Sequence, residues 1–190
     1  MERVRKFLKD SADLKIQVAE TLSDKILEAA QLVHQRLAQG GKLLLMGNGG
    51  SAGDAQHIAA ELIGRFKKER RAIPAIALTV DTSTLTALGN DYGFDTVFSR
   101  QIEALARKGD VVVGISTSGN SENVVRALTL ANEIGADTIG LLGNEGGRAK
   151  EHVGIAIVVP SNDTARIQET HITIGHIICE IIEQEIVNEN

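Results

Sequence analysis

The chain has 190 residues, of which 43% are hydrophobic, and its formal net charge is −5 at pH 7; these values predict one globular domain, residues 1–190, with a sizeable core. No basic block offsets the acidic balance and no apolar run approaches the ~18 residues of a membrane span, so neither nucleic acid nor a membrane is expected as a partner. The only cysteine, Cys179, has no partner for an internal disulfide, and the charged N-terminus leads into no signal-like apolar core, so we expect a cytoplasmic protein.

The first 40 residues carry helical periodicity. Apolar side chains recur on stripes through residues 2–38, and a break near Ser23 and Asp24 predicts two helices rather than one. The sequence Gln39-Gly40-Gly41 is typical of the end of the second helix. Since a simple βαβ unit has no place for two leading helices, we expect them to pack on the domain or on a partner subunit.

From residue 42 onward, predicted strands and helices alternate. This alternation predicts a doubly wound, mostly parallel five-stranded α/β sheet flanked by helices. The expected strands are residues 42–46, 73–78, 111–115, 138–142 and 154–159. The expected helices are residues 51–66, a short helix after the threonine-rich residues 79–84, residues 95–107, 121–134 and 164–187.

A glycine-rich turn, residues 47–51, follows the first strand and opens a helix. Glycines let the backbone turn sharply, Ser51 with Asp54 resembles a capping box, and free N–H groups at a helix start favour an anion. The alternative is a tight turn without a ligand, and the pattern leaves both open. On the same helix His57 and Glu61 are four residues apart and share a face, so they are either an acid/base or metal pair or, more commonly, a surface pair.

The stretch Ser116-Thr117-Ser118-Gly119-Asn120-Ser121 directly follows the predicted central strand. In such sheets ligands bind beyond the carboxyl ends of the strands. Four hydroxyls and the free N–H groups of a helix start suit a phosphate monoester held by neutral donors. Ser121 alone would serve as an N-cap, but four hydroxyls exceed what a cap needs, which favours the phosphate site.

Two further polar groups complete the pattern. Asn90 and Asp91 are expected in a loop after the second strand and its short helix. The last helix carries Gln168 and His176 eight residues apart, close to the same face, among apolar neighbours. Taken singly, each is more often polar surface or a satisfied core residue, although a histidine on a mostly buried helix needs a partner.

Five motifs together resemble one family. They are residues 47–51, His57 with Glu61 and residues 64–65, residues 89–91, residues 116–121, and residues 166–169 with His176. In order and spacing, over nearly the whole chain, they resemble the bacterial sedoheptulose 7-phosphate isomerases (phosphoheptose isomerases) of the sugar-isomerase, or SIS, flavodoxin-like fold.

The resemblance implies an aldose–ketose isomerase that converts sedoheptulose 7-phosphate to D-glycero-D-manno-heptose 7-phosphate, in heptose biosynthesis for cell-envelope glycans. It implies Glu61 as general base and His176 as general acid. It also implies one zinc ion per subunit, held by His57, Glu61, Gln168 and His176, and a homotetramer in which residues 1–40 contribute to assembly. The implied substrate-binding residues are Asn48, Gly49, Gly50, Ser51, Glu61, Asn90, Asp91, Ser116, Thr117, Ser118, Ser121 and Gln168, with residues 116–121 holding the phosphate.

The chemistry fits these residue types, and two alternatives stay open. Moving a proton between C1 and C2 through an enediol needs a carboxylate and a histidine with pKa values near neutrality, and a cation would stabilise the enediolate. Some SIS relatives are instead non-catalytic interaction factors, one of which associates with the replication initiator and lacks the matching glutamate and last-helix histidine. Another alternative is a different sugar-phosphate-binding SIS protein. Ala165 departs from the aspartate that some family members have there.

Overall fold

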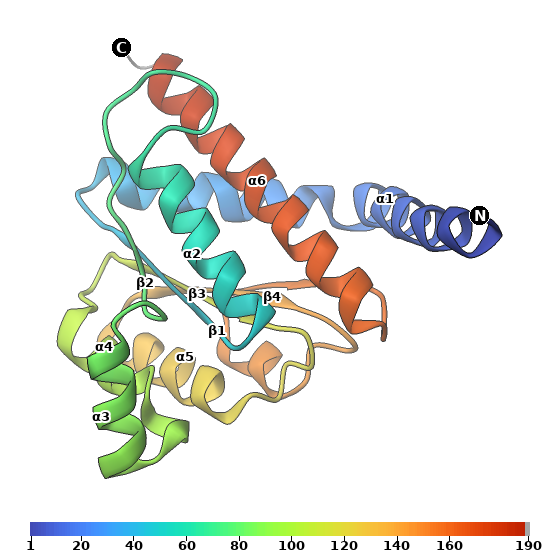
Figure 1. Ribbon diagram of the computed structural model, residues 1–190. Coiled ribbons are helices and arrows are strands. Elements are labelled where there is room, and N and C mark those ends of the chain that lie inside the picture. The colour runs from blue at the N-terminus through green and yellow to red at the C-terminus, as the bar shows by residue number, and fades with distance from the viewer. Residues whose placement is uncertain (189–190) are drawn as a thin grey trace.

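The computed structural model describes residues 1–188, and a five-stranded parallel sheet forms its centre (Figure 1). The strands are β1 (Leu43–Gly47), β2 (Ala75–Ala77), β3 (Val111–Ser116), β4 (Asp137–Leu142) and β5 (Ile155–Val158). They lie in the order β2-β1-β3-β4-β5, and every neighbouring pair is parallel. The predicted doubly wound fold is therefore confirmed, and its switch point lies between β1 and β3.

Helices cover both faces of the sheet. They are α1 (Glu2–Ala38), α2 (Gly50–Ile63), α3 (Thr82–Tyr92), α4 (Ser99–Leu105), α5 (Glu122–Ile134) and α6 (Thr164–Asn188), with short 3₁₀ turns at Phe94–Thr96 and Arg148–His152. Helices α1, α2 and α6 pack on one face, and α3, α4 and α5 lie on the other (Figure 1). Successive β1 side chains alternate between the two cores: Leu43 and Leu45 face α2 and α6, whereas Leu44 and Met46 face α5. Burial on both faces explains the uninterrupted apolar run of this strand.

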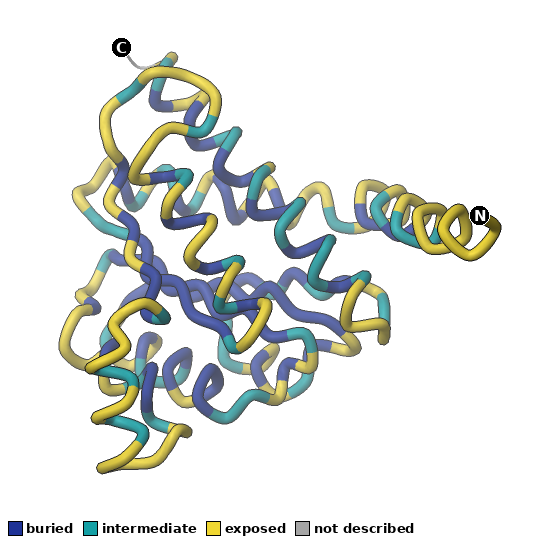
Figure 2. The backbone as a smooth tube through the Cα atoms, in the orientation of Figure 1, coloured by how far each residue is buried: buried dark blue, intermediate teal, exposed yellow. Residues whose placement is uncertain are grey.

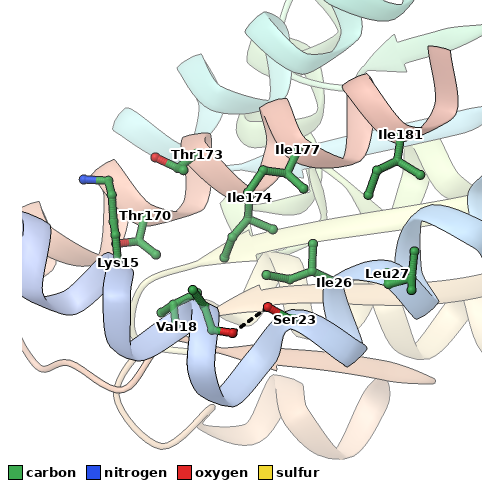
Figure 3. Close-up of a pocket in the computed structure, with 11 residues that line it drawn as sticks. Lys15, Val18, Ser23, Ile26, Leu27, Thr170, Thr173, Ile174, Ile177 and Ile181 are labelled. Carbon is green, nitrogen blue, oxygen red and sulfur yellow. Dashed lines mark hydrogen bonds between the residues drawn. The ribbon is translucent and has the colours of Figure 1, made fainter. Parts of the chain in front are cut away.

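The N-terminal segment forms one helix, so the predicted break near Ser23 and Asp24 is wrong. No glycine or proline interrupts residues 2–38. The hydroxyl of Ser23 donates to the carbonyl of Ala19 at 2.5 Å, a bond drawn in Figure 3, and Thr21 bonds back to Gln17 in the same way. These polar side chains thus satisfy carbonyls of their own helix instead of capping a new one, and the helix runs through.

The two halves of α1 lie in different surroundings. Buried residues concentrate in the second half, whereas the first half projects beyond the sheet and is mostly exposed (Figure 2). An apolar groove of about 340 Å³ runs between α1 and α6 (Figure 3). Among the described residues, no helix is both long enough and apolar enough to cross a membrane.

Helix α2 ends at Ile63, three residues earlier than predicted, because its C-terminal end is held by groups from elsewhere in the chain. Arg70 donates to the carbonyls of Glu61 and Leu62, which a longer helix would occupy. The expected helix over residues 95–107 is also shorter, since a 3₁₀ turn precedes α4. The strand expected over residues 73–78 pairs only at Ala75–Ala77.

Candidate active site

Two helices bring a carboxylate and two imidazoles together. His57 and Glu61 lie one turn apart on α2, and His176 reaches them from α6. The Nε2 atoms of His57 and His176 are 3.0 Å apart, and His57 Nε2 is 3.1 Å from Glu61 Oε1. Gly175 permits this approach, since a Cβ there would lie only 2.6 Å from the Ile58 side chain on α2. The structure therefore joins three residues that the sequence placed on two separate helices.

The His57–Glu61–His176 cluster fits a metal ion. Its three ligand atoms all lie within 4.8 Å of one another. Two imidazole nitrogens and a carboxylate oxygen are a zinc donor set, and a Zn–N bond is about 2.0–2.1 Å, so nitrogens 3.0 Å apart can share one ion. Gln168, the fourth predicted ligand, packs its amide against Gly50 at the start of α2. Within residues 1–188 no hydrogen bond joins Gln168 to the cluster.

A buried ion pair holds the segment next to the cluster. Glu183 on α6 is 2% exposed and its carboxylate accepts three backbone N–H bonds, from residues 66–68, at 2.8–3.0 Å. The buried Arg70 side chain lies 3.3 Å from Glu183. Burial acts to raise the pKa of the Glu183 carboxyl, but the three N–H donors and the Arg70 charge outweigh it and hold the pKa below its usual value. The same segment places the Phe66 ring 5.5 Å from the His176 ring.

The glycine-rich turn after β1 is as tight as predicted, but its capping is different. A Cβ at Gly47 would meet the backbone of Ser51, and Gly49 has φ +57°, a left-handed conformation that favours glycine. Helix α2 begins at Gly50 with Gly49 as N-cap and no side-chain capping bond, so the predicted capping box is wrong. Ser51 is buried. One buried oxygen of Asp54 has no hydrogen-bond partner among residues 1–188, and burial raises the pKa of its carboxyl.

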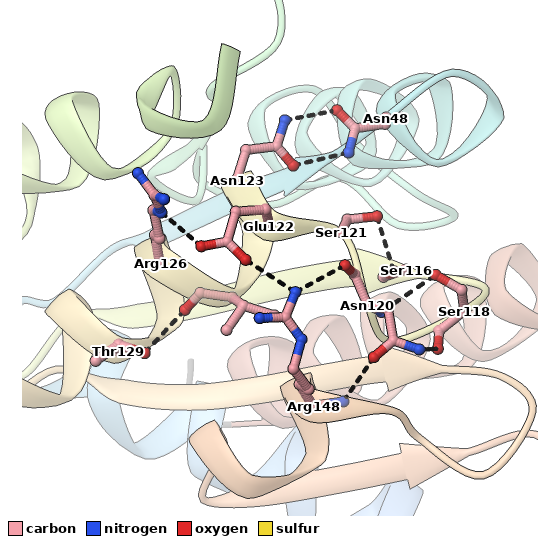
Figure 4. Close-up of polar contacts among 11 residues, drawn as sticks. Asn48, Ser116, Ser118, Asn120, Ser121, Glu122, Asn123, Arg126, Thr129 and Arg148 are labelled. Carbon is pink, nitrogen blue, oxygen red and sulfur yellow. Dashed lines mark hydrogen bonds and ion pairs between the residues drawn. The ribbon is translucent and has the colours of Figure 1, made fainter. Parts of the chain in front are cut away.

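The serine-rich loop after β3 is held by its own side chains (Figure 4). The hydroxyls of Ser116 and Ser121 lie 3.2 Å apart, Ser116 accepts the N–H of Gly119, and Ser118 accepts the N–H of Asn120. Ser121 is the N-cap residue of α5, but its side chain makes no capping bond. The alternative in which Ser121 only caps the helix is therefore not seen. Its hydroxyl instead contacts the hydroxyl of Ser116 within the loop.

Arg148, in the 3₁₀ turn after β4, also holds this loop. Its guanidinium donates to the carbonyl of Asn120 and to the Glu122 carboxylate, and its backbone N–H donates to the Asn120 side chain (Figure 4). Hydrogen bonds from Arg126 and Arg148 hold the pKa of the Glu122 carboxyl below its usual value. A cavity of about 460 Å³ lies beside the loop, lined by Ser118, Asn120, Asn144, Glu145, Gly147 and Asn162.

Comparison with known proteins shows which family has this sequence and fold. A sequence profile of the SIS domain matches residues 6–143. The phosphoheptose isomerase of Aquifex aeolicus is 55% identical over 184 residues, which cover 97% of this chain and 96% of that protein. The chain belongs to the phosphoheptose isomerase family.

Two solved structures of the phosphoheptose isomerase family share the fold. The enzyme of Neisseria gonorrhoeae superposes with a TM-score of 0.91 at 47% identity, over 96% of this chain and 98% of the other. The enzyme of Francisella tularensis gives a TM-score of 0.93 at 39% identity, over 96% of this chain and 97% of the other. These two enzymes therefore share the fold over 96% of this chain.

Two of the predicted site residues lie on a helix that the sequence did not predict there. Asn90 and Asp91 belong to the last turn of α3 and not to a loop, so that prediction is wrong. Both are exposed, and Asn90 donates to the Asp91 carboxylate at 2.8 Å. Within the described part of the chain, no hydrogen bond links them to the turn after β1 or to the serine-rich loop.

A second histidine of α6, His171, is fully buried. Its Nε2 donates to the carbonyl of Leu142 on β4 at 3.0 Å, and burial lowers its pKa to about 4. A neutral imidazole therefore ties α6 to the sheet three residues after Gln168. The bond offsets part of the cost of burying a polar ring.

Four residues around the site were not expected from the sequence: Phe66, Arg70, Asn123 and Glu183. Glu183 offered a signal, because it interrupts the apolar stripe of Ile182 and Ile186 on the last helix, and a charge in such a position needs a partner. The other three have no distinctive local pattern. Their contacts come from segments distant in sequence.

Proposed function

We propose that this chain is an aldose–ketose isomerase that converts sedoheptulose 7-phosphate to D-glycero-D-manno-heptose 7-phosphate, in the cytoplasm, for the heptose of cell-envelope glycans. The observation that carries the proposal is the convergence of Glu61 with His57 and His176 at the α2–α6 contact. The family supports it, because relatives that are 55% and 61% identical over 97% and 90% of this chain are phosphoheptose isomerases. The glutamate and last-helix histidine are the residues that separate the enzyme from a non-catalytic SIS protein.

In the proposed reaction Glu61 is the general base and His176 the general acid. The Glu61 carboxylate takes the proton from C1 of the ketose while His176 protonates the C2 carbonyl oxygen, which forms the C1=C2 bond of the enediol. Glu61 then returns its proton to C2, and His176 accepts the proton of the C1 hydroxyl as the new carbonyl forms. The two transfers balance, so no oxidant or reductant is needed.

The serine-rich loop is the proposed phosphate site. Ser116, Thr117, Ser118 and Ser121 supply hydroxyls, and the start of α5 supplies N–H groups and the positive end of its dipole. Asn48, Gly49, Gly50, Ser51, Glu61 and Gln168 complete the proposed substrate contacts from β1, α2 and α6. Asn90 and Asp91 remain proposed sugar contacts. Both are exposed, and we propose that they contact the sugar bound by a neighbouring subunit.

We include one zinc ion per subunit in the proposal, held by His57, Glu61, Gln168 and His176. When bound, the ion supplies a cation that stabilises the oxygen of an enediolate. A carboxylate oxygen or imidazole nitrogen that ligates metal is not free to exchange a proton, so the metal-binding and proton-transfer roles of Glu61 and His176 belong to different states of the site. The cluster geometry supports His57, Glu61 and His176 as ligands.

The proposed assembly is a homotetramer in which residues 1–40 contact other subunits. Support comes from exposed apolar side chains on α1, with 58% of Phe7, 68% of Leu8 and 59% of Ile16 accessible. An apolar groove also lies between α1 and α6 (Figure 3). Light scattering at micromolar concentration tests the assembly, and a monomer mass would refute it.

The decisive experiment mixes the purified protein with sedoheptulose 7-phosphate and follows the aldose product. Turnover supports the enzyme. Capture of a protein partner without any turnover would instead indicate the interaction factor, and tight binding of a hexose phosphate without heptose turnover would indicate another sugar-phosphate SIS protein.

A further inference from the structure

One pair of amides joins the two loops at the switch point of the sheet. Asn48 directly follows β1, and Asn123 lies in the first turn of α5, just after the serine-rich loop that follows β3. The Nδ2 of Asn48 donates to Oδ1 of Asn123 at 2.9 Å, and Nδ2 of Asn123 donates to Oδ1 of Asn48 at 3.0 Å (Figure 4). Because β1 and β3 are neighbouring parallel strands, this pair spans the crevice in which such sheets bind ligands.

The two amides are not equivalent. Asn123 is 3% exposed, whereas Asn48 is half-buried. A primary amide has two N–H donors and two acceptor lone pairs, so one N–H and one lone pair of Asn48 remain after the pair has formed. Asn123 has too little exposed surface to meet a ligand itself. Its two hydrogen bonds act on Asn48 alone.

We infer that Asn123 is a positioning residue: it holds the Asn48 amide in the crevice so that the free N–H and lone pair of Asn48 meet a hydroxyl of the sugar. This inference rests on the proposed function. It assigns to Asn123 a role in recognising the sugar and not the phosphate, because the phosphate loop is held by its own serines and by Arg148. Without the Asn123 amide, the Asn48 side chain is free to rotate, and its remaining N–H no longer points in one fixed direction.

The test compares Asn123→Leu, which keeps a similar volume but makes no hydrogen bond, with Asn48→Ala and the double variant. The KM for sedoheptulose 7-phosphate, the inhibition constant of inorganic phosphate and the melting temperature are measured for each. We expect Asn123→Leu and Asn48→Ala each to raise KM about tenfold or more and to leave the phosphate inhibition constant within about twofold. The double variant should be no worse than the worse single variant, since both changes remove one contact.

Asn132→Leu is the matched control. Asn132 lies on the same helix, and its amide also makes two hydrogen bonds, to the carbonyl of His152 and to Thr138, but at the other end of α5. A general loosening of α5 would raise the KM of this control as well. We expect the control to keep the wild-type KM.

Each outcome decides the inference. An unchanged KM in folded Asn123→Leu, an equal rise in KM and in the phosphate inhibition constant, or additive losses in the double variant would overturn it. Should Asn123→Leu fail to fold, Asn123→Ala is judged by the same criteria. A wild-type protein that neither turns over nor binds sedoheptulose 7-phosphate overturns the proposed function and this inference with it, whereas a working wild type beside an unaffected Asn123→Leu overturns the inference alone.

Discussion

The serine-rich loop and the His57–Glu61–His176 cluster are built in opposite ways. The loop comes from six consecutive residues whose hydroxyls bond to nearby backbone N–H groups. The cluster joins residues 119 positions apart, and its geometry depends on the packing of α2 against α6. A binding loop can therefore be recognised from local sequence, whereas a catalytic or metal cluster depends on all the contacts that fix two helices relative to each other.

Removing the proton acceptor of the cluster should have the largest effect on activity. Glu61→Gln should lower turnover by roughly 10²–10⁴-fold or more, because the amide is nearly isosteric but accepts no proton at neutral pH. Binding of the sugar phosphate, measured by calorimetry, should persist, since the serine-rich loop is untouched. His176→Ala should also lower turnover strongly, and the two losses should be far from additive. Near-native turnover in Glu61→Gln would refute the proposed mechanism.

A second prediction concerns the Arg70–Glu183 ion pair, which holds the segment next to the cluster. Glu183→Gln should cost about 3–5 kcal/mol of unfolding free energy, because it leaves Arg70 as a buried charge without its counter-ion. Urea unfolding measures the loss. The control is Glu180→Gln on the same helix, whose exposed pair with Lys67 is worth about 0–1 kcal/mol. Equal losses in the two variants would contradict the structural role of Glu183.

A pH experiment tests another anchor of α6. The folded-state pKa of His171 is lowered to about 4 from the ordinary 6.5, so the folded protein prefers the neutral imidazole. His171 therefore makes its full contribution to the free energy of unfolding above pH 6.5. This contribution, about 3 kcal/mol, is lost progressively as the pH falls toward 4. Urea unfolding at pH 7 and pH 4.5 should show a smaller decrease for His171→Gln than for the wild type. The same decrease in both proteins would argue against this assignment.

The local loop offers the next test. Ser118→Ala combined with Ser121→Ala should weaken substrate binding, since each donor lost to a desolvated phosphate costs about 1–3 kcal/mol. The melting temperature should change little, because both residues lie outside the buried core. An unchanged KM together with unchanged inhibition by inorganic phosphate would remove this loop from the binding site.

The last prediction separates the metal from the acid/base chemistry. His57→Ala should lower bound zinc and activity together, and a chelator should have the same effect on the wild type. Metal content by atomic emission gives the first readout. If activity survives both treatments, any zinc is incidental, and the proton transfer by Glu61 and His176 stands without it.

Much of the architecture follows from local sequence patterns. The apolar run of β1 and the alternation of strands and helices depend on near neighbours, and both were confirmed. The serine-rich loop and the turn at Gly47 were also placed correctly after their strands. Side-chain bonding within α1 explains why the predicted break at Ser23 failed: the same polar residue either caps a helix or bonds back to it, and composition does not distinguish the two.

The assembly of the site depends on contacts between segments that are distant in the sequence. Gly175 against Ile58 sets how closely α6 approaches α2, and this approach brings His57 to His176. The Arg70–Glu183 pair and the Asn48–Asn123 pair likewise join segments that are separated by many residues. Periodicity tells which face of a helix is apolar, but the distance between two helices depends on side chains that interlock across the interface, and no local pattern contains that information.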